Sequence, residues 1–500
     1  MRITKSKYLS FINCPKQFWL GCNHPELATV DASCDRLFEQ GNEIGKLALK
    51  LFNGVESAVA ENIDGSLDIE QMCQNTQRLV AANCSAIAEA AFSNANNYCA
   101  VDVLKNNFDG TWDMYEVKSS TSRKGSYLYD IALQHFVLAQ ANIKVRKCNL
   151  VYVNRDYTRV NGLDVNELFI TEDVTDFLPE FEKEIAVNIQ RAQDLCSQEE
   201  PQIDININCN DEYPCAYYDY CSRHLPRNNV FDLYGKGFSK KTKFECYNKG
   251  IITFEDLRNN HVALKEKQQR QVDFTLDNLS PLVNKTEIKK FLDQINFPIY
   301  FLDFETYQYA APPYDGIKVN QQVPFQYSLH ILKNNGGELE HKEFLADENK
   351  NEWRKLAEQL VKDIPANGGT LLSYNSSFEN PRLKEMANAF PDLRDALNDM
   401  VSRMKDLLDV FRGGYYYSKE MGGSFSIKSV LPAVFPNDPS LDYKMLDGVQ
   451  NGTGAVSAFA SLKNLSAEKR QELRENLLKY CCLDSYAMVK LYNELVAKAQ

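Results

Sequence analysis

The sequence predicts an α/β protein with two α/β domains joined by a helical linker. Apolar residues make up 44% of the 500 positions, which is enough to build more than one core. Strand-like apolar runs occur in both halves, as CAVDVLK and FPIYFLDFETY, among segments with helical periodicity. We therefore place one domain in residues 1–225, a basic helical linker in 226–290 and a second domain in 291–500.

The composition predicts a globular protein of the cytoplasm. The N-terminus MRITKSKYLS lacks the continuous apolar stretch of a secretion signal, and the fourteen cysteines are therefore expected to be mostly reduced. The net charge of −12 argues against a passive nucleic-acid binder. Carboxylates can instead hold divalent cations, and residues 232–270 carry a local basic excess of nine Lys and Arg over five Asp and Glu.

The first candidate site lies on two predicted neighbouring strands, CAVDVLK and TWDMYEVKSS. Alternation places Glu116 and Lys118 on one face of the second strand, and Asp102 can lie opposite them on the first. Two such carboxylates can hold Mg²⁺ or Mn²⁺ at a phosphate, while the lysine orients water or stabilises charge. The alternative is an exposed hairpin in which these residues form a cross-strand ion pair.

This pattern resembles the RecB-type branch of the PD-(D/E)XK nucleases, which have a restriction-endonuclease-like fold. In that family an acid on one strand precedes a Glu-x-Lys on the next, and a helix with a glutamine follows; ALQHFVLAQ supplies Gln134. RecB-like nucleases usually carry a histidine on an early helix. The corresponding segment FEQGNEIGKLA has none, and Glu43 is the substitute we assign as a metal ligand.

Four cysteines form a second feature of this half. CNDEYPCAYYDYC spaces Cys209, Cys215 and Cys221 by five intervening residues each, and Cys14 lies near the N-terminus in LSFINCPKQFWL. Four thiolates suit a [4Fe–4S] cluster or a structural zinc ion, and unligated thiols in an aromatic loop are the alternative. The arrangement resembles that of iron–sulfur RecB-like nucleases, including the CRISPR-associated exonuclease and the AddB subunit, which implies the [4Fe–4S] cluster.

The linker contains a predicted helical hairpin. KTKFECYNKGIITFEDL has the outline of two helices around a turn at Asn248, Lys249 and Gly250. It resembles a helix-hairpin-helix module with a reduced glycine turn, which implies phosphate binding through backbone amides and lysines. A plain helical hairpin between two domains is the alternative.

The second candidate site begins on the strand IYFLDFETY, where Asp303 and Glu305 lie two residues apart and therefore share a face. LLSYNSSFENPRL predicts a strand, a loop and a helix start that carry Asn375 and Glu379. Farther along, Tyr480 and Asp484 lie at i and i+4 of a predicted helix and share one helical face. These acids can hold one or two divalent cations, and the tyrosine can position a water molecule.

This second set resembles the DEDDy 3′–5′ exonucleases of the ribonuclease-H-like fold. Their motifs run Asp-x-Glu, then Asn-x-x-(Phe/Tyr)-Asp, then Tyr-x-x-x-Asp. The middle motif here has an extra residue and ends in Glu379, so the longer acid departs from the family pattern. Asp406 in MKDLLDVFR is a further candidate acid. The alternative is that these residues are unrelated surface acids.

The tandem arrangement resembles a bacterial family that joins a RecB-like nuclease domain to a ribonuclease-H-like exonuclease domain. The resemblance implies a metal-dependent nuclease that cuts DNA, at single-stranded ends, with Mg²⁺ or Mn²⁺, together with a helicase or a repair or defence partner. Two alternatives stay open: a nucleic-acid-binding or assembly protein with inactive sites, and an RNA-processing exonuclease. The aromatic segment GGYYYSKEMGGSFSIK could stack bases, with Lys428 on a phosphate, or form core or edge strand.

Overall fold

The computed structural model describes residues 1–29, 33–94, 97–210 and 214–500. The chain forms two compact units. Unit 1 comprises Met1–Arg223 and Tyr309–Gln321, and unit 2 comprises His224–Gln308 and Gln322–Gln500. The predicted mixed α/β class is confirmed. A search of the described helices finds none with both the length and the apolarity needed to cross a membrane.

Unit 1 is built on a mixed sheet, to which seven strands contribute in the described residues. Strands β3, β4 and β5 form an antiparallel meander, β6 runs parallel to β5, and β7 returns antiparallel. Two short strands, β1 and β2, pair in parallel with β4 and β3. The strands are β1 (Ile3–Thr4), β2 (Val55–Ser57), β3 (Ala86–Ser93), β4 (Asn97–Asn106), β5 (Trp112–Lys118), β6 (Val145–Val153) and β7 (Phe169–Asp173).

Helix α5 is the central helix of unit 1, since it connects β5 to the parallel strand β6 and packs on the sheet. Its apolar side chains join those of β3, β4 and helix α8 in the main core. The segment 309–321 adds Ala310, Ala311 and Val319 to a smaller core with β6. The helices are α1 (Lys5–Asn13), α2 (Pro15–Asn23), α3 (Ser33–Ala48), α4 (Ile69–Ala81), α5 (Gly125–Gln140), α6 (Val165–Leu168), α7 (Leu178–Glu182), α8 (Ile185–Cys196) and α9 (Tyr218–Ser222).

Unit 2 contains a sheet with the order β11-β10-β9-β12-β13. Strand β10 pairs antiparallel with both β9 and β11, whereas β12 and β13 run parallel to β9. A separate pair, β8 and β14, joins the middle segment to the later part of the unit. The strands are β8 (Leu282–Val283), β9 (Ile299–Gln308), β10 (Gln322–Leu332), β11 (Leu339–Leu345), β12 (Leu371–Ser373), β13 (Met404–Asp406) and β14 (Tyr416–Tyr417).

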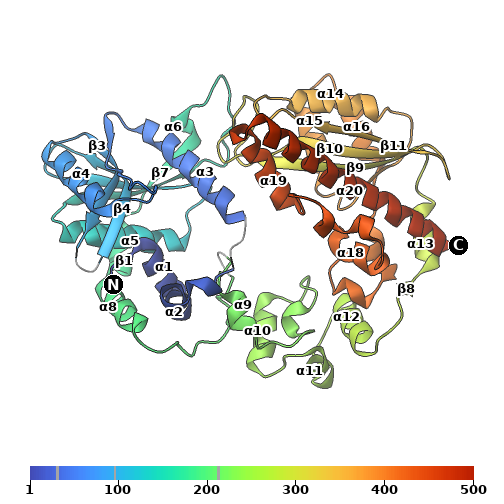
Figure 1. The fold of residues 1–500 in the computed structure, drawn as a ribbon, viewed down its shortest axis with the longest axis horizontal. Helices are drawn as coiled ribbons and strands as arrows, with labels where there is room; N and C mark the ends of the chain where they lie inside the picture. The colour runs from blue at the N-terminus through green and yellow to red at the C-terminus, as the bar shows by residue number, and fades with distance from the viewer. Residues whose placement is uncertain (30–32, 95–96, 211–213) are drawn as a thin grey trace. The chain divides into compact units, whose positions relative to one another are not determined.

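The long helix α20 covers one face of this sheet, while α14 contacts the other (Figure 1). Alternation on β9 explains the division: Phe301 packs on Tyr492 of α20, whereas Tyr300 lies beneath Arg403 of α16. The helices are α10 (Lys240–Asn248), α11 (Phe254–Asn259), α12 (Glu266–Leu276), α13 (Lys285–Leu292), α14 (Trp353–Asp363), α15 (Glu379–Ala389), α16 (Arg394–Arg403), α17 (Leu408–Arg412), α18 (Ile427–Val434), α19 (Gly452–Ser461) and α20 (Ala467–Ala499).

The structure describes two segments that the sequence singled out in unit 2, the helical hairpin and the aromatic segment. The helical hairpin of the middle segment is α10 and α11, with Gly250 in the left-handed region at φ 74°. Phosphate binding by this hairpin stays a prediction. In the aromatic segment, Tyr416 and Tyr417 are buried in the core of unit 2 as strand β14, so these two rings are core and short-strand residues and are closed to base stacking.

Candidate functional site

Three carboxylates converge between β9 and α20 in unit 2. Asp303 and Glu305 come from β9, and Asp484 comes from the middle of α20. One ligand oxygen of each lies within 4.8 Å of the other two. Glu305 and Asp484 are buried and Asp303 is partly exposed. The strand alternation and the helix packing therefore bring together residues that are separated by 179 positions in the chain.

Burial raises the pKa of all three carboxyl groups, and repulsion between negative charges raises it further for Asp303 and Glu305. For Asp303 the pKa is raised first by burial and then by the negative charges of Asp484 and Glu305. The pKa of Glu305 is raised by burial and by Asp484. The pKa of Asp484 is about 6, because burial raises it while a hydrogen bond from Tyr443 opposes the rise. Three carboxylates this close together, two of them buried, are costly to ionise unless a cation neutralises them, so the chemistry fits a divalent metal ion.

Two tyrosines and a lysine border these acids. The hydroxyl of Tyr443 donates to Oδ1 of Asp484 over 2.5 Å. Lys428 donates to the hydroxyl of Tyr480 over 3.4 Å, and its ammonium lies 4.8 Å and 5.2 Å from the ring centres of Tyr443 and Tyr480. Tyr480 is thus beside the acids, as its i, i+4 relation to Asp484 suggested. Tyr443 was missed, because it follows a loop and a short 3₁₀ turn with no sequence pattern.

Glu379 begins α15 and is 2% exposed. Burial raises its pKa to about 8, with a further rise from the charge of Asp406. Its negative charge also raises the pKa of Asp303 and of Glu305, although Glu379 is outside the group of three acids that lie within 4.8 Å. Glu379 can therefore approach a cation from the side of β12, as a carboxylate adjacent to the three acids.

Asp406 binds the backbone of the loop that precedes α15. Its carboxylate accepts hydrogen bonds from the backbone amides of Asn375, Ser376 and Leu408, at 2.8, 3.0 and 3.0 Å. Asn375 has a left-handed backbone with φ 77°. Asp406 therefore fixes the loop that precedes α15, and it positions Glu379 indirectly.

Two small residues complete the surroundings of the unit 2 acids. The Cys481 thiol donates to Oδ2 of Asp303 over 3.6 Å and is fully buried. Gly452, the first residue of α19, allows close approach: a Cβ atom there would lie 3.9 Å from Oε2 of Glu305 and 4.0 Å from the hydroxyl of Tyr480. Neither residue belongs to a sequence pattern that would have predicted its place beside the acids.

In unit 1, Glu116 is the centre of a buried network of charged groups. Its Oε1 accepts from Lys118 at 2.6 Å and from Lys5 at 2.8 Å, and its Oε2 accepts from Gln134 at 2.7 Å. Asp130 accepts from the same lysine, Lys118, at 2.6 Å and from Gln134 at 2.8 Å. Burial would raise the pKa of Glu116, but the two lysines outweigh it and hold this pKa well below its usual range.

Asp102 and Glu89 lie on the same sheet beside Glu116. The pairing of Val103 with Tyr115 places Asp102 opposite Glu116, and Asp102 accepts from the amide of Val117 over 2.6 Å. Burial and then the charge of Glu116 raise the pKa of Asp102 to about 8. Glu89 has a left-handed backbone at φ 52°, and its pKa is raised by burial and by Glu116.

The structure brings together Asp102, Glu116, Lys118 and Gln134, whereas Glu43 lies apart. Glu43 is exposed on α3, and within the described residues it takes no part in the hydrogen bonds of the network. Glu89 of β3 is the further acid that lies near Glu116. Lys5 and Asp130 were missed as well. The i, i+4 relation of Asp130 to Gln134 was the available signal, since it places both on one face of α5.

The four cysteines of the predicted cluster line a single cavity in unit 1. Cys14 precedes α2, and Cys221 lies in α9. Burial raises the pKa of Cys221 to about 11, with contributions from Cys215, Cys14 and Cys209, so the four thiols lie close enough to interact. All four are free thiols. In the described part of the chain, no three of these sulfurs meet the 4.8 Å limit that the three acids of unit 2 satisfy.

Comparison with known families matches part of unit 2. A family model described as a domain of unknown function, DUF2779, matches residues 300–426. The match runs from β9 to the residue before α18, so it includes Asp303, Glu305 and Glu379 but ends before Tyr443 and α20. No curated protein and no solved structure matches the chain. The expected relationship to nuclease families therefore stays a prediction.

Proposed function

We propose that this protein is a metal-dependent nuclease whose principal site is formed by Asp303, Glu305 and Asp484. The observation that carries the proposal is the convergence of these three carboxylates within 4.8 Å, with Tyr480 and Lys428 at their border. Phosphodiester hydrolysis needs a cation, a water molecule and positive charge near the phosphate. The acids can hold the cation, Tyr480 can orient the water molecule and Lys428 can supply the positive charge.

Each residue of the site has a separate role in the proposed hydrolysis. Asp303, Glu305 and Asp484 would hold Mg²⁺ or Mn²⁺, and Glu379 would approach from the side of β12. The cation supplies charge neutralisation at the phosphate and makes water more acidic. The Tyr480 hydroxyl is placed to orient water, and the Lys428 ammonium, which is on an exposed residue, to contact a phosphate oxygen.

The topology of unit 2 supports a ribonuclease-H-like assignment. Its strand order, with three antiparallel strands followed by two that are parallel to the first, is the order of that fold. The acids occur in the DEDDy order on strand β9, at the start of helix α15 and on the last helix, α20. We therefore propose a 3′–5′ exonuclease that acts on single-stranded DNA ends. The departure at Glu379 lengthens one acid by a methylene group and is expected to change the metal preference.

The support for a second, RecB-like nuclease site in unit 1 is weaker. Asp102, Glu116, Lys118 and Gln134 lie together on adjacent strands and a helix, as in the PD-(D/E)XK pattern. However, two lysines and a glutamine already occupy both oxygens of Glu116. This closed network favours a second role for unit 1, as a module that binds nucleic acid or a helicase or repair partner without cutting.

We propose that Cys14, Cys209, Cys215 and Cys221 hold a [4Fe–4S] cluster. They line one cavity, and four cysteine thiolates are the ligand set of a [4Fe–4S] cluster. Anaerobic purification followed by iron, sulfide and zinc analysis tests this. The Cys215→Ser variant should lose iron and sulfide together. Loss of one zinc equivalent instead would assign a structural zinc ion.

The nuclease proposal is tested with end-labelled single-stranded DNA, double-stranded DNA and RNA, each with Mg²⁺, Mn²⁺ or EDTA. Asp303→Asn should abolish cation-dependent degradation, while Asp395→Asn, an exposed acid of the same unit, should not. Lys118→Ala measures the contribution of unit 1. Degradation of RNA alone would assign RNA processing. Binding without cleavage under every metal would assign the nucleic-acid-binding or assembly alternative.

A further inference from the structure

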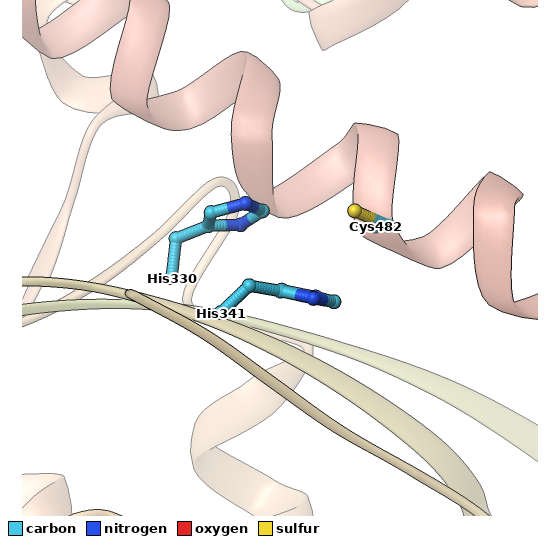
Figure 2. A group of neighbouring side chains, drawn as sticks. All are labelled: His330, His341 and Cys482. Carbon is cyan, nitrogen blue, oxygen red and sulfur yellow. The ribbon is translucent and has the colours of Figure 1, made fainter. Parts of the chain in front are cut away.

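Unit 2 contains a second group of metal-binding side chains, which the proposed nuclease site does not use. His330 lies on β10, His341 on β11 and Cys482 on α20. Figure 2 shows the two imidazole rings close together above the sheet, with the Cys482 sulfur directed toward them from the helix. One ligand atom of each residue lies within 4.8 Å of the other two.

Strand register holds the two histidines together. His330 and His341 are direct partners in the antiparallel pairing of β10 with β11, and their ring centres lie 4.5 Å apart. Direct partners on one face of an antiparallel pair are fixed by the backbone hydrogen bonds. The two imidazoles are therefore preorganised, and Cys482 closes the group from the third element.

Serine hydroxyls orient both rings. Nδ1 of His330 is 2.8 Å from the hydroxyl of Ser485, and Nε2 of His341 is 2.9 Å from the hydroxyl of Ser328. The two hydroxyls also hydrogen-bond to each other over 2.6 Å. One nitrogen of each ring is thus held by the protein, and the other nitrogen is the natural ligand. Metal-binding histidines are usually oriented in this way by an outer hydrogen bond.

The donor set distinguishes this group from the carboxylate site. Two imidazoles and a thiolate suit zinc, whereas Mg²⁺ and Mn²⁺ prefer oxygen ligands. Burial lowers the pKa of His330 to about 4, which favours the neutral imidazole that binds metal. Glu343 lies two residues from His341 on β11, so its exposed carboxylate faces the same side and can supply a fourth ligand.

We propose that His330, His341 and Cys482 form a structural zinc site that fastens helix α20 to strands β10 and β11. A tetrahedral zinc ion places its ligand atoms roughly 3.5 Å apart, so modest side-chain rotations close the group. Binding releases the thiol proton to solvent. Asp484 and Tyr480 lie on the same helix within two residues of Cys482, so the ion would also fix the helix that carries them.

Zinc affinity tests the proposal independently of any cleavage assay. The Cys215→Ser/Cys221→Ser double variant serves as the background, because it disables the cysteine cluster of unit 1. The metal-free protein is titrated with Zn²⁺ against a chromophoric chelator, and with Co²⁺, whose spectrum reports tetrahedral geometry and a thiolate ligand. We expect one tight equivalent, weakened by roughly 100-fold or more in His341→Ala and in Cys482→Ser, and about tenfold in Ser485→Ala.

Matched controls separate loss of a ligand from loss of folding. His341 is exposed, so His341→Ala should leave the circular dichroism spectrum and the unfolding temperature of the metal-free protein unchanged. Cys246→Ser, a buried thiol elsewhere in unit 2, should keep full zinc affinity. Zinc should raise the unfolding temperature of the background protein but not of His341→Ala. Equal zinc affinity in all variants, or no tight equivalent in the background, overturns the proposal.

Discussion

The hydroxyl of Tyr443 donates a 2.5 Å hydrogen bond to Oδ1 of Asp484, across 41 residues of sequence. This bond favours the ionised form of a carboxylate that burial would otherwise keep protonated, and the pKa of Asp484 is about 6. An ionised carboxylate is the form that binds a cation. Tyr443 therefore acts on cation binding through Asp484, as a positioning residue.

Tyr443→Phe should weaken Mn²⁺ binding in a pH-dependent way. Loss of the donor raises the pKa of Asp484, so protons compete more strongly with the cation, and affinity should fall about tenfold near pH 6 and less at pH 8. Mn²⁺ titration followed by electron paramagnetic resonance measures this. Tyr492→Phe, in the core against Phe301, is the control. Equal losses at both pH values would contradict the linkage.

Glu379→Gln should stabilise the metal-free protein at high pH. The pKa of Glu379 is about 8, above its ordinary value of 4.5, so the folded state holds a proton that the unfolded state has released. Stability is therefore lost as pH rises from 4.5 to 8, by about 1.4 kcal/mol for each pH unit of this window. The variant lacks this loss. Urea unfolding at pH 5 and pH 8.5 should show a difference from wild type only at the higher pH.

Lys5→Met should destabilise unit 1 because it removes part of the charge that compensates Glu116. Glu116 is 1% exposed, and breaking a buried ion pair costs about 3 kcal/mol. Lys147→Met is the matched control, since Lys147 and Asp173 form an exposed pair whose loss costs less than about 1 kcal/mol. Denaturant unfolding of the unit 1 transition distinguishes them. Equal effects would show that the network contributes no more than a surface ion pair.

Gly452→Leu should reduce cleavage without unfolding the protein. A leucine side chain here would extend from a Cβ position 3.9 Å from Glu305 into the space beside Tyr480. Gly452→Ala is the matched control, because a Cβ at this distance is in ordinary van der Waals contact. We expect kcat/KM to fall by about 100-fold for leucine and by less than about threefold for alanine. Equal activity of the two variants would place the substrate path elsewhere.

Local periodicity predicted part of each candidate site. The two-residue alternation of strands placed Glu116 with Lys118 and Asp303 with Glu305, and the i, i+4 repeat of a helix placed Tyr480 with Asp484. These relationships depend only on backbone geometry over a few residues. The alternation also predicted Asp102 opposite Glu116, because a short polar turn connects their strands.

Contacts between residues far apart in the sequence were decided by the tertiary structure. Lys5 reaches Glu116 across 111 residues, Tyr443 reaches Asp484 across a helix and two loops, and Cys482 meets His330 and His341 only when α20 packs on β10 and β11. Asp406, which the sequence suggested as a further acid near the site, accepts hydrogen bonds from loop amides that only the folded chain brings to it. The sequence by itself determined which side chains share a strand or helix face. Strand register and helix packing determined which faces meet, because these contacts depend on pairings over long chain separations that no local pattern encodes.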